Sequence, residues 1–139
     1  MTVTSSTCLL HTNEIDVREL PEDVDLVELI RRAQDDPELG TACSWVLSYA
    51  DDEVPWYMSP ALMVGVRVGT GALVWDDRLP LRPTNGTNAE PVDYWLGGPH
   101  HTPMEARTEI PGEQTLAAVA EFVRTGRRPT CVEWQPIGS

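Results

Sequence analysis

Residues 111–135, PGEQTLAAVAEFVRTGRRPTCVEWQ, change from a helical pattern to a strand pattern within a short distance. Four apolar residues fall on one stripe of a helix expected over 111–129: Leu116, Val119, Ala120 and Val123. Gly126 followed by Pro129 is a typical helix end. TCVEWQ (130–135) then predicts a strand that returns beside this helix.

Three arginines gather at the expected end of this helix: Arg124, Arg127 and Arg128. The negative end of the helix dipole favours cations, so the simplest interpretation of the cluster is helix capping. In the strand that follows, Cys131 and Val132 are candidates for the core, and Glu133 is expected to face solvent. The simplest interpretation of this end of the chain is therefore structural: a helix followed by the strand that returns beside it.

The rest of the chain adds a second helix and several short strands. The helix is expected over PEDVDLVELIRRAQDD (21–36), where Pro21 and a group of acids suit a helix start. Strands are expected at 43–50, at 61–77 as a pair joined near Thr70 and Gly71, at 92–97 and at 104–110. In 104–110, alternation predicts a polar face with Glu105, Arg107 and Glu109.

This order of elements predicts an α+β fold, an antiparallel sheet of about five to six strands with two helices packed on it. The length suits one domain over 1–139, with 1–20 as an N-terminal segment. Loops are expected at 51–60, 78–91 and 98–103, where proline, glycine and polar residues are frequent.

The chain is strongly acidic, with a net charge of −12, and all of its basic residues are arginine. Residues 1–70 contain 13 acids and 4 arginines, and residues 71–139 contain 9 acids and 6 arginines. This balance argues against direct nucleic-acid binding, which requires a basic surface, and favours a basic partner. The alternative is that the charge only keeps the protein soluble.

Neither a metal site nor a catalytic signature is expected. Cys8, Cys43 and Cys131 are widely spaced, and the adjacent His100 and His101 point apart on a turn. No nucleophile or phosphate-loop motif organises the remaining polar residues, so we expect no catalytic residues and no cofactor. The N-terminus has no signal-peptide pattern and no apolar run is long enough to cross a membrane, which predicts a cytoplasmic protein.

Three stretches place carboxylates beside Trp or Tyr: DDEVPWYM (51–58), VWDD (74–77) and DYW (93–95). Aromatic rings supply contact area at low entropic cost, and carboxylates speed association with a basic partner. The alternative is that the rings belong to the core and the acids only solvate loops. Three such stretches in one small domain favour a binding surface.

The C-terminal residues resemble the signature of the Imm1 family of bacterial immunity proteins. The likeness rests on Ala117, Ala118, Val119, Glu121, Phe122, the turn from Thr125 to Pro129, and the strand from Cys131 to Trp134. It covers roughly 43–135. The resemblance implies an α+β fold, no catalysis and a dedicated toxin partner, bound one to one. Members often accompany nucleic-acid-modifying toxins, including nucleases and deaminase-fold enzymes.

With a toxin as the partner, the acidic and aromatic stretches become the expected interface. The expected toxin-binding residues are Asp51, Asp52, Glu53, Trp56, Tyr57, Trp75, Asp76 and Asp77, followed by Asp93, Tyr94 and Trp95. Neither Glu133 nor Trp134 is assigned to the interface on the strength of the motif. The alternative function is a small-ligand-binding or regulatory module, whose Trp residues would line a pocket.

Overall fold

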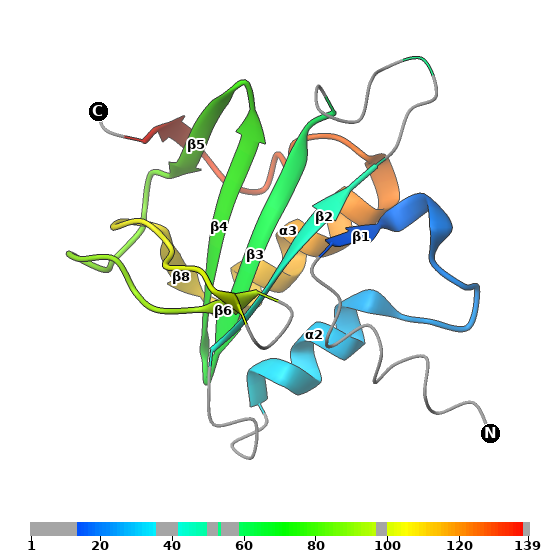
Figure 1. The fold of residues 1–139 in the computed structure, drawn as a ribbon, viewed down its shortest axis with the longest axis horizontal. Coiled ribbons are helices and arrows are strands. Elements are labelled where there is room, and N and C mark those ends of the chain that lie inside the picture. Colours follow the sequence, from blue (N-terminus) through cyan, green and yellow to red (C-terminus); the bar gives the residue numbers. More distant parts are fainter. Residues whose placement is uncertain (1–13, 36–41, 50–52, 54–58, 97–99, 138–139) are drawn as a thin grey trace.

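The computed structural model describes residues 14–35, 42–49, 53, 59–96 and 100–137, most of which belong to a twisted β-sheet and two helices (Figure 1). The helices are α2 (Leu26–Asp35) and α3 (Gly112–Thr125), and a short 3-10 turn, η1 (Val17–Glu19), precedes them. The strands are β1 (Glu14–Asp16), β2 (Cys43–Ser48), β3 (Ala61–Arg67), β4 (Thr70–Asp77), β5 (Leu79–Pro83), β6 (Trp95–Leu96), β7 (His100–His101), β8 (Glu109–Pro111) and β9 (Trp134–Pro136).

The strands lie in the order β7-β6-β2-β3-β4-β5-β9, with β1 paired to β2 and β8 paired to β4. Most neighbours are antiparallel, while β1 and β6 run parallel to β2. Both helices pack against the same face of the sheet, where Ile30, Leu62 and Phe122 are fully buried in one apolar cluster. The α+β prediction is confirmed.

The opposite face of the sheet has a second, smaller core. Met104 and Tyr94, from the long connection between β5 and β8, pack there against Ala72 and Val74 of β4. The ring of Tyr94 lies so close to Gly65 of β3 that a Cβ at this glycine would be 2.7 Å from it. The connection therefore covers part of a sheet face that would otherwise meet solvent.

The helix predictions hold best at the C-terminus. The chain leaves α3 through Gly126, which has a φ of 69° and donates its N–H to the carbonyl of Phe122 at 2.7 Å. The start of α2 was predicted too early. Val24 N–H donates to the carbonyl of Pro21 in a separate turn, and Asp25 then caps α2 by accepting from the N–H of Glu28.

Several strand predictions are wrong in detail. The turn between β3 and β4 lies at Val68 and Gly69, two residues earlier than predicted, and Gly69 has a φ of 73°. The expected loops at 78–91 and 98–103 contain β5 and β7. These short strands lack an alternating pattern, and their place is set by their partners across the sheet.

The strands predicted at 104–110 and 130–135 also differ from expectation, because the structure has the shorter strands β8 (Glu109–Pro111) and β9 (Trp134–Pro136) there. Glu109 is buried, at 3% exposure, where alternation predicted a polar face. The last strand is β9, which begins only at Trp134, and Cys131 is exposed where a core position was expected. Val132 is buried and Glu133 is exposed, as predicted.

Candidate binding surfaces

One end of the sheet carries the predicted binding stretch 74–77. The residues Ser48, Ala61, Asp76 and Pro80 pair in a single row across β2, β3, β4 and β5. Because β2 ends and β3 begins near this row, the described residues Tyr49 and Ser59 lie at the same end of the sheet as the β4–β5 hairpin (Figure 1). We call this edge the hairpin end of the sheet.

The β4–β5 hairpin presents two carboxylates, the guanidinium of Arg78 and the side chain of Leu79 to solvent. Asp76 and Asp77 are exposed, and Leu79 is 67% exposed. Arg78, between the paired residues Asp77 and Leu79, has a φ of 71°, a conformation that costs energy for a residue with a Cβ. Two exposed carboxylates near an exposed leucine can contact a basic partner, although the exposed Arg78 between them leaves this hairpin with a net charge of only −1.

Two of the aromatic residues expected at the interface belong to the core. Trp75 is only 4% exposed and meets Phe122 edge to face, with ring centroids 5.8 Å apart. Tyr94 has no exposed surface. Neither ring is available to a partner in this structure. For Trp75 the reason is strand alternation, which turns its side chain inward and that of Asp76 outward.

The third stretch lies at the opposite end of β2. Trp95 pairs with Cys43, and the side chain of Asp93 meets Nε2 of His101 at 2.7 Å. The indole of Trp95 is half-buried beside the same imidazole. The structure therefore places 74–77 and 93–95 at opposite ends of the sheet. Asp51, Asp52, Trp56 and Tyr57 lie outside the described residues, whereas Glu53 is described and exposed.

A further acid-rich segment was not among the predicted binding stretches. Seven carboxylates lie on β1, η1, the turn and the start of α2: Glu14, Asp16, Glu19, Glu22, Asp23, Asp25 and Glu28. Arg18 is the only basic residue in this segment. The charge imbalance of the first half was the available signal, but Glu22, Asp23 and Asp25 were interpreted as a helix start.

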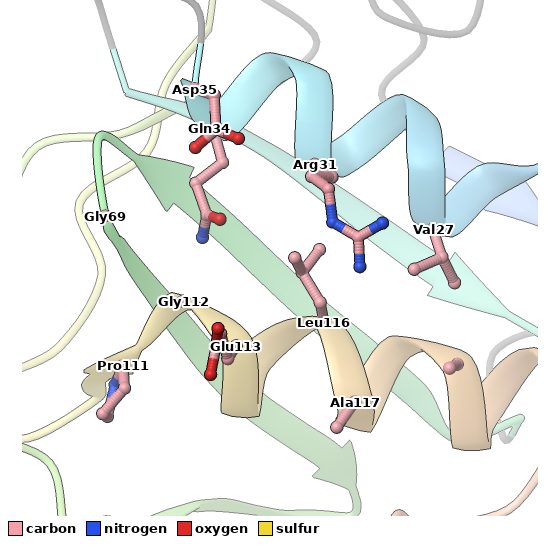
Figure 2. A pocket seen from close by; sticks show the side chains of 11 residues that line it. Val27, Arg31, Gln34, Asp35, Gly69, Pro111, Gly112, Glu113, Leu116 and Ala117 are labelled. Carbon is pink, nitrogen blue, oxygen red and sulfur yellow. The ribbon is translucent and has the colours of Figure 1, made fainter.

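A groove runs between α2 and α3 on the helical side of the sheet (Figure 2). Its volume is about 660 Å³, and apolar side chains line it from both helices, including Val27 and Leu116. Gln34 points from α2 toward the first turn of α3, and its side chain is buried among these residues. No local sequence pattern predicts this groove, because it depends on how the two helices pack.

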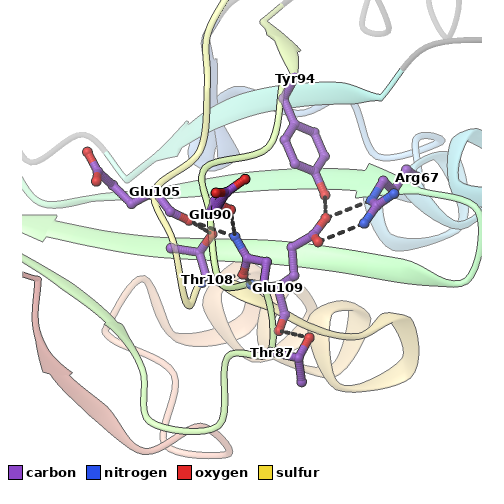
Figure 3. Close-up of polar contacts among 8 residues, drawn as sticks. Arg67, Thr87, Glu90, Tyr94, Glu105, Thr108 and Glu109 are labelled. Carbon is purple, nitrogen blue, oxygen red and sulfur yellow. Dashed lines mark hydrogen bonds and ion pairs between the residues drawn. The ribbon is translucent and has the colours of Figure 1, made fainter.

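A buried polar network ties the β5–β8 connection to the sheet (Figure 3). Arg67 donates to both carboxylate oxygens of Glu109 at 2.7 Å, and the hydroxyl of Tyr94 donates to the same carboxylate at 2.7 Å. Asn88 accepts the backbone N–H groups of Thr108 and Glu109. These contacts satisfy a buried carboxylate and hold the connection against the sheet.

The pKa values in this network follow from burial and pairing. Burial alone would raise the pKa of Glu109, but the hydrogen bonds from Arg67 and Tyr94 outweigh it and hold the pKa below its ordinary value. Burial, reinforced by the carboxylate, raises the pKa of Tyr94. At neutral pH the network is therefore an ionised carboxylate held by a guanidinium and a neutral phenol.

Within the described part of the chain, no group of three or more His, Cys, Asp or Glu side chains is arranged to hold a metal ion. No helix in that part is both long enough and apolar enough to cross a membrane. The candidate sites are thus surfaces and a groove.

A comparison with family models gives a match over most of the chain. The model described as immunity protein Imm1 matches residues 15–136. The chain belongs to the Imm1 family. No curated protein gives a significant match. Membership implies an immunity protein directed against a toxin, in a family that generally acts without catalysis. The Imm1 match also includes β1 and α2, which the resemblance seen in the sequence left out.

In this Imm1 chain, residues of the C-terminal motif form hydrogen bonds that hold the segment after α3 in place. The carboxylate of Glu121 on α3 accepts the backbone N–H of Thr130 at 2.7 Å, its hydroxyl at 2.8 Å and the N–H of Cys131 at 3.1 Å. These bonds, led by the one from the Thr130 N–H, lower the pKa of Glu121. Trp134 donates its indole N–H to the carbonyl of Pro129 at 2.9 Å.

Proposed function

We propose that this Imm1 protein neutralises a nucleic-acid-modifying toxin, of the deaminase-fold or nuclease kind, by covering its basic substrate cleft in a one-to-one complex. It would act in the cytoplasm, without catalysis and without contacting nucleic acid itself. The observation that carries the proposal is the exposure of Asp76, Asp77 and Leu79 at the hairpin end of the sheet, in a protein of an immunity family.

The charges of the chain support this mode of inhibition. A toxin that acts on nucleic acid must attract phosphates, so its cleft presents arginine and lysine side chains. Carboxylates at the hairpin end can occupy such a cleft in place of phosphates, and Leu79 can add apolar contact area. The acidic segment of β1, η1 and the start of α2 increases the long-range attraction and so the association rate.

The interface that we propose is smaller than the predicted set of residues. Trp75 and Tyr94 are buried, and Asp93 and Trp95 lie beside His101 at the opposite end of β2, so we leave these four out of it. The interface we propose therefore comprises Glu53, Asp76, Asp77 and Leu79 among the described residues, together with the predicted residues of 51–58. A compact site of this kind can concentrate most of the binding energy in a few side chains.

The first experiment uses the neighbouring toxin gene. The C-terminal domain encoded immediately upstream is expressed in bacteria with and without this protein, growth is scored, and the pair is purified. We expect growth to be restored and a stable one-to-one complex to form. Persistent toxicity in the presence of soluble, folded protein would contradict the proposal for that toxin and return the small-ligand alternative.

The second experiment reverses charge at the hairpin end. Asp76→Arg combined with Asp77→Arg should slow association with the toxin roughly tenfold at low salt and flatten its salt dependence, because local attraction is lost. Glu90→Arg with Glu105→Arg is the matched control, since both residues are exposed and the change in net charge is the same. Equal slowing in both variants would show that only net charge matters and would remove the hairpin from the interface.

A further inference from the structure

The groove between α2 and α3 contains a hydrogen-bond donor without an acceptor. Gln34 is 5% exposed, and its side-chain Nε2 has no hydrogen-bond partner among the described residues. Burying an amide donor without an acceptor is unfavourable, and buried donors in folded proteins rarely lack one. Figure 2 shows the amide directed from α2 toward the N-terminal end of α3.

The surroundings of Gln34 hold its amide in this place. The side chain lies directly over Gly112, where any Cβ would collide with the amide nitrogen. The N–H of Gly112 is already used, because it donates to the carbonyl of Gly69 at 3.2 Å. The absence of a side chain at the start of α3 therefore leaves room for the Gln34 amide, which faces the groove.

The charges around the groove favour a cation over an anion. Asp35 and Glu113 both line it and are exposed, whereas the one guanidinium in the lining, that of Arg31, is 3.0 Å from the carboxylate of Glu28. The N-terminal end of α3 would by itself attract an anion, since Pro111 provides no side-chain cap. Two nearby carboxylates oppose that attraction, so a ligand with a negative charge is disfavoured.

We propose that the groove receives a short basic segment of the toxin. A main-chain carbonyl of that segment accepts the Nε2–H of Gln34, and the aliphatic part of an arginine or lysine side chain packs on Val27, Leu116 and Ala117. Its charged head lies between Asp35 and Glu113. This contact rests on the proposed function and adds to the hairpin end a second, separate point of attachment on the helical side of the sheet.

The first test uses small probes on the whole, ¹⁵N-labelled protein. N-acetyl-arginine methylamide carries a carbonyl, an aliphatic stem and a cation, N-acetyl-norleucine methylamide lacks the cation, and acetate supplies only an anion. We expect the arginine probe to shift the Gln34 side-chain amide signals with saturation in the millimolar range, and norleucine to bind several-fold more weakly. A saturable acetate shift, or no shift with the arginine probe, would overturn the proposal.

Variants separate the hydrogen bond from the charge. Gln34→Met keeps the volume and removes the donor, and should weaken the arginine probe about 3- to 10-fold. Asp35→Asn with Glu113→Gln should abolish the preference for arginine over norleucine, while Glu90→Gln, an exposed control outside the groove, should change neither. If Gln34→Met does not fold, the shift of the wild-type Gln34 amide signals on addition of the arginine probe still tests the proposal.

The purified toxin complex then tests the occupant. We expect the Gln34 amide signals to move on complex formation and Gln34→Met to accelerate dissociation. A complex that forms without moving them would overturn this contact and leave the proposed function intact. Failure of growth rescue would overturn the proposed function, and with it the toxin as occupant, whatever the probes show. Shifts of the amide on dilution of the free protein would mean that a second copy fills the groove, which also overturns the proposal.

Discussion

The hairpin end of the sheet and the Glu109 network both place a carboxylate near an aromatic ring, but they do so in opposite senses. At the hairpin, Trp75 is inside against Phe122 while Asp76 and Asp77 are exposed. In the network, the carboxylate of Glu109 is inside, and Arg67 and the hydroxyl of Tyr94 both donate to it.

The difference lies in what compensates the charge. Water solvates the carboxylates of Asp76 and Asp77, so folding does not desolvate them and they remain available to a partner. Glu109 is buried at 3% exposure and is stable as an anion only because three donated hydrogen bonds replace its water. A carboxylate beside an aromatic residue therefore indicates a binding site only where the carboxylate is exposed.

The largest expected effect tests the inside of the hairpin. Trp75→Ala should lower the free energy of unfolding by about 3–5 kcal/mol, because it leaves a cavity against Phe122. Urea unfolding followed by circular dichroism measures it. Asp77→Ala, at the exposed end of the same strand, should change the free energy of unfolding by no more than about 0.5 kcal/mol. A small loss in Trp75→Ala would mean that the ring is not part of the core and would restore it as a candidate contact.

The next effect tests the network. Glu109→Gln keeps the shape of the side chain but turns an NH₂ group toward the guanidinium of Arg67, so a charge-assisted bond is lost. We expect a loss of about 2 kcal/mol in the free energy of unfolding at pH 7. Glu105→Gln, an exposed glutamate on the same connection, is the control and should be neutral.

The stability difference between the wild type and Glu109→Gln should depend on pH, and its direction follows from the shifted pKa of Glu109. The pKa of Glu109 is lower in the folded protein than in the unfolded chain, so its contribution is complete above the ordinary glutamate value. It is lost as the pH falls through the lowered pKa, and the gap between wild type and Glu109→Gln should close in acid. A gap that stays constant down to the acid transition would mean that the carboxylate is not held as an anion by Arg67.

Much of the architecture followed from local sequence signals. The α3 helix and its end at Gly126 depend on a stripe of apolar residues and a positive φ, both of which act within a few residues. The β3–β4 pair was expected from its apolar run. By contrast β5 and β7 are short, with no pattern of their own, and exist because a neighbouring strand supplies hydrogen bonds.

The candidate sites were harder to predict for the same reason. Burial of Glu109 depends on Arg67, which is 42 residues earlier in the chain, and no local spacing signals that pair. The groove at Gln34 requires α2 and α3 to meet, and its recess requires Gly112 at one position. Strand alternation could have separated Trp75 from Asp76, because adjacent residues on a strand face opposite sides.

The smallest expected effect concerns a third carboxylate, Glu121, which lies between the two cases. It is partly exposed but accepts three hydrogen bonds from Thr130 and Cys131, so it holds the chain after α3. Glu121→Gln retains one acceptor oxygen and should cost about 1 kcal/mol, against no change for the exposed Glu133→Gln. Growth rescue from the toxin should be unaffected in both. Weaker toxin binding by Glu121→Gln at unchanged stability would instead make the family motif part of the interface, and a partly exposed carboxylate with internal partners could then no longer be assigned to folding alone.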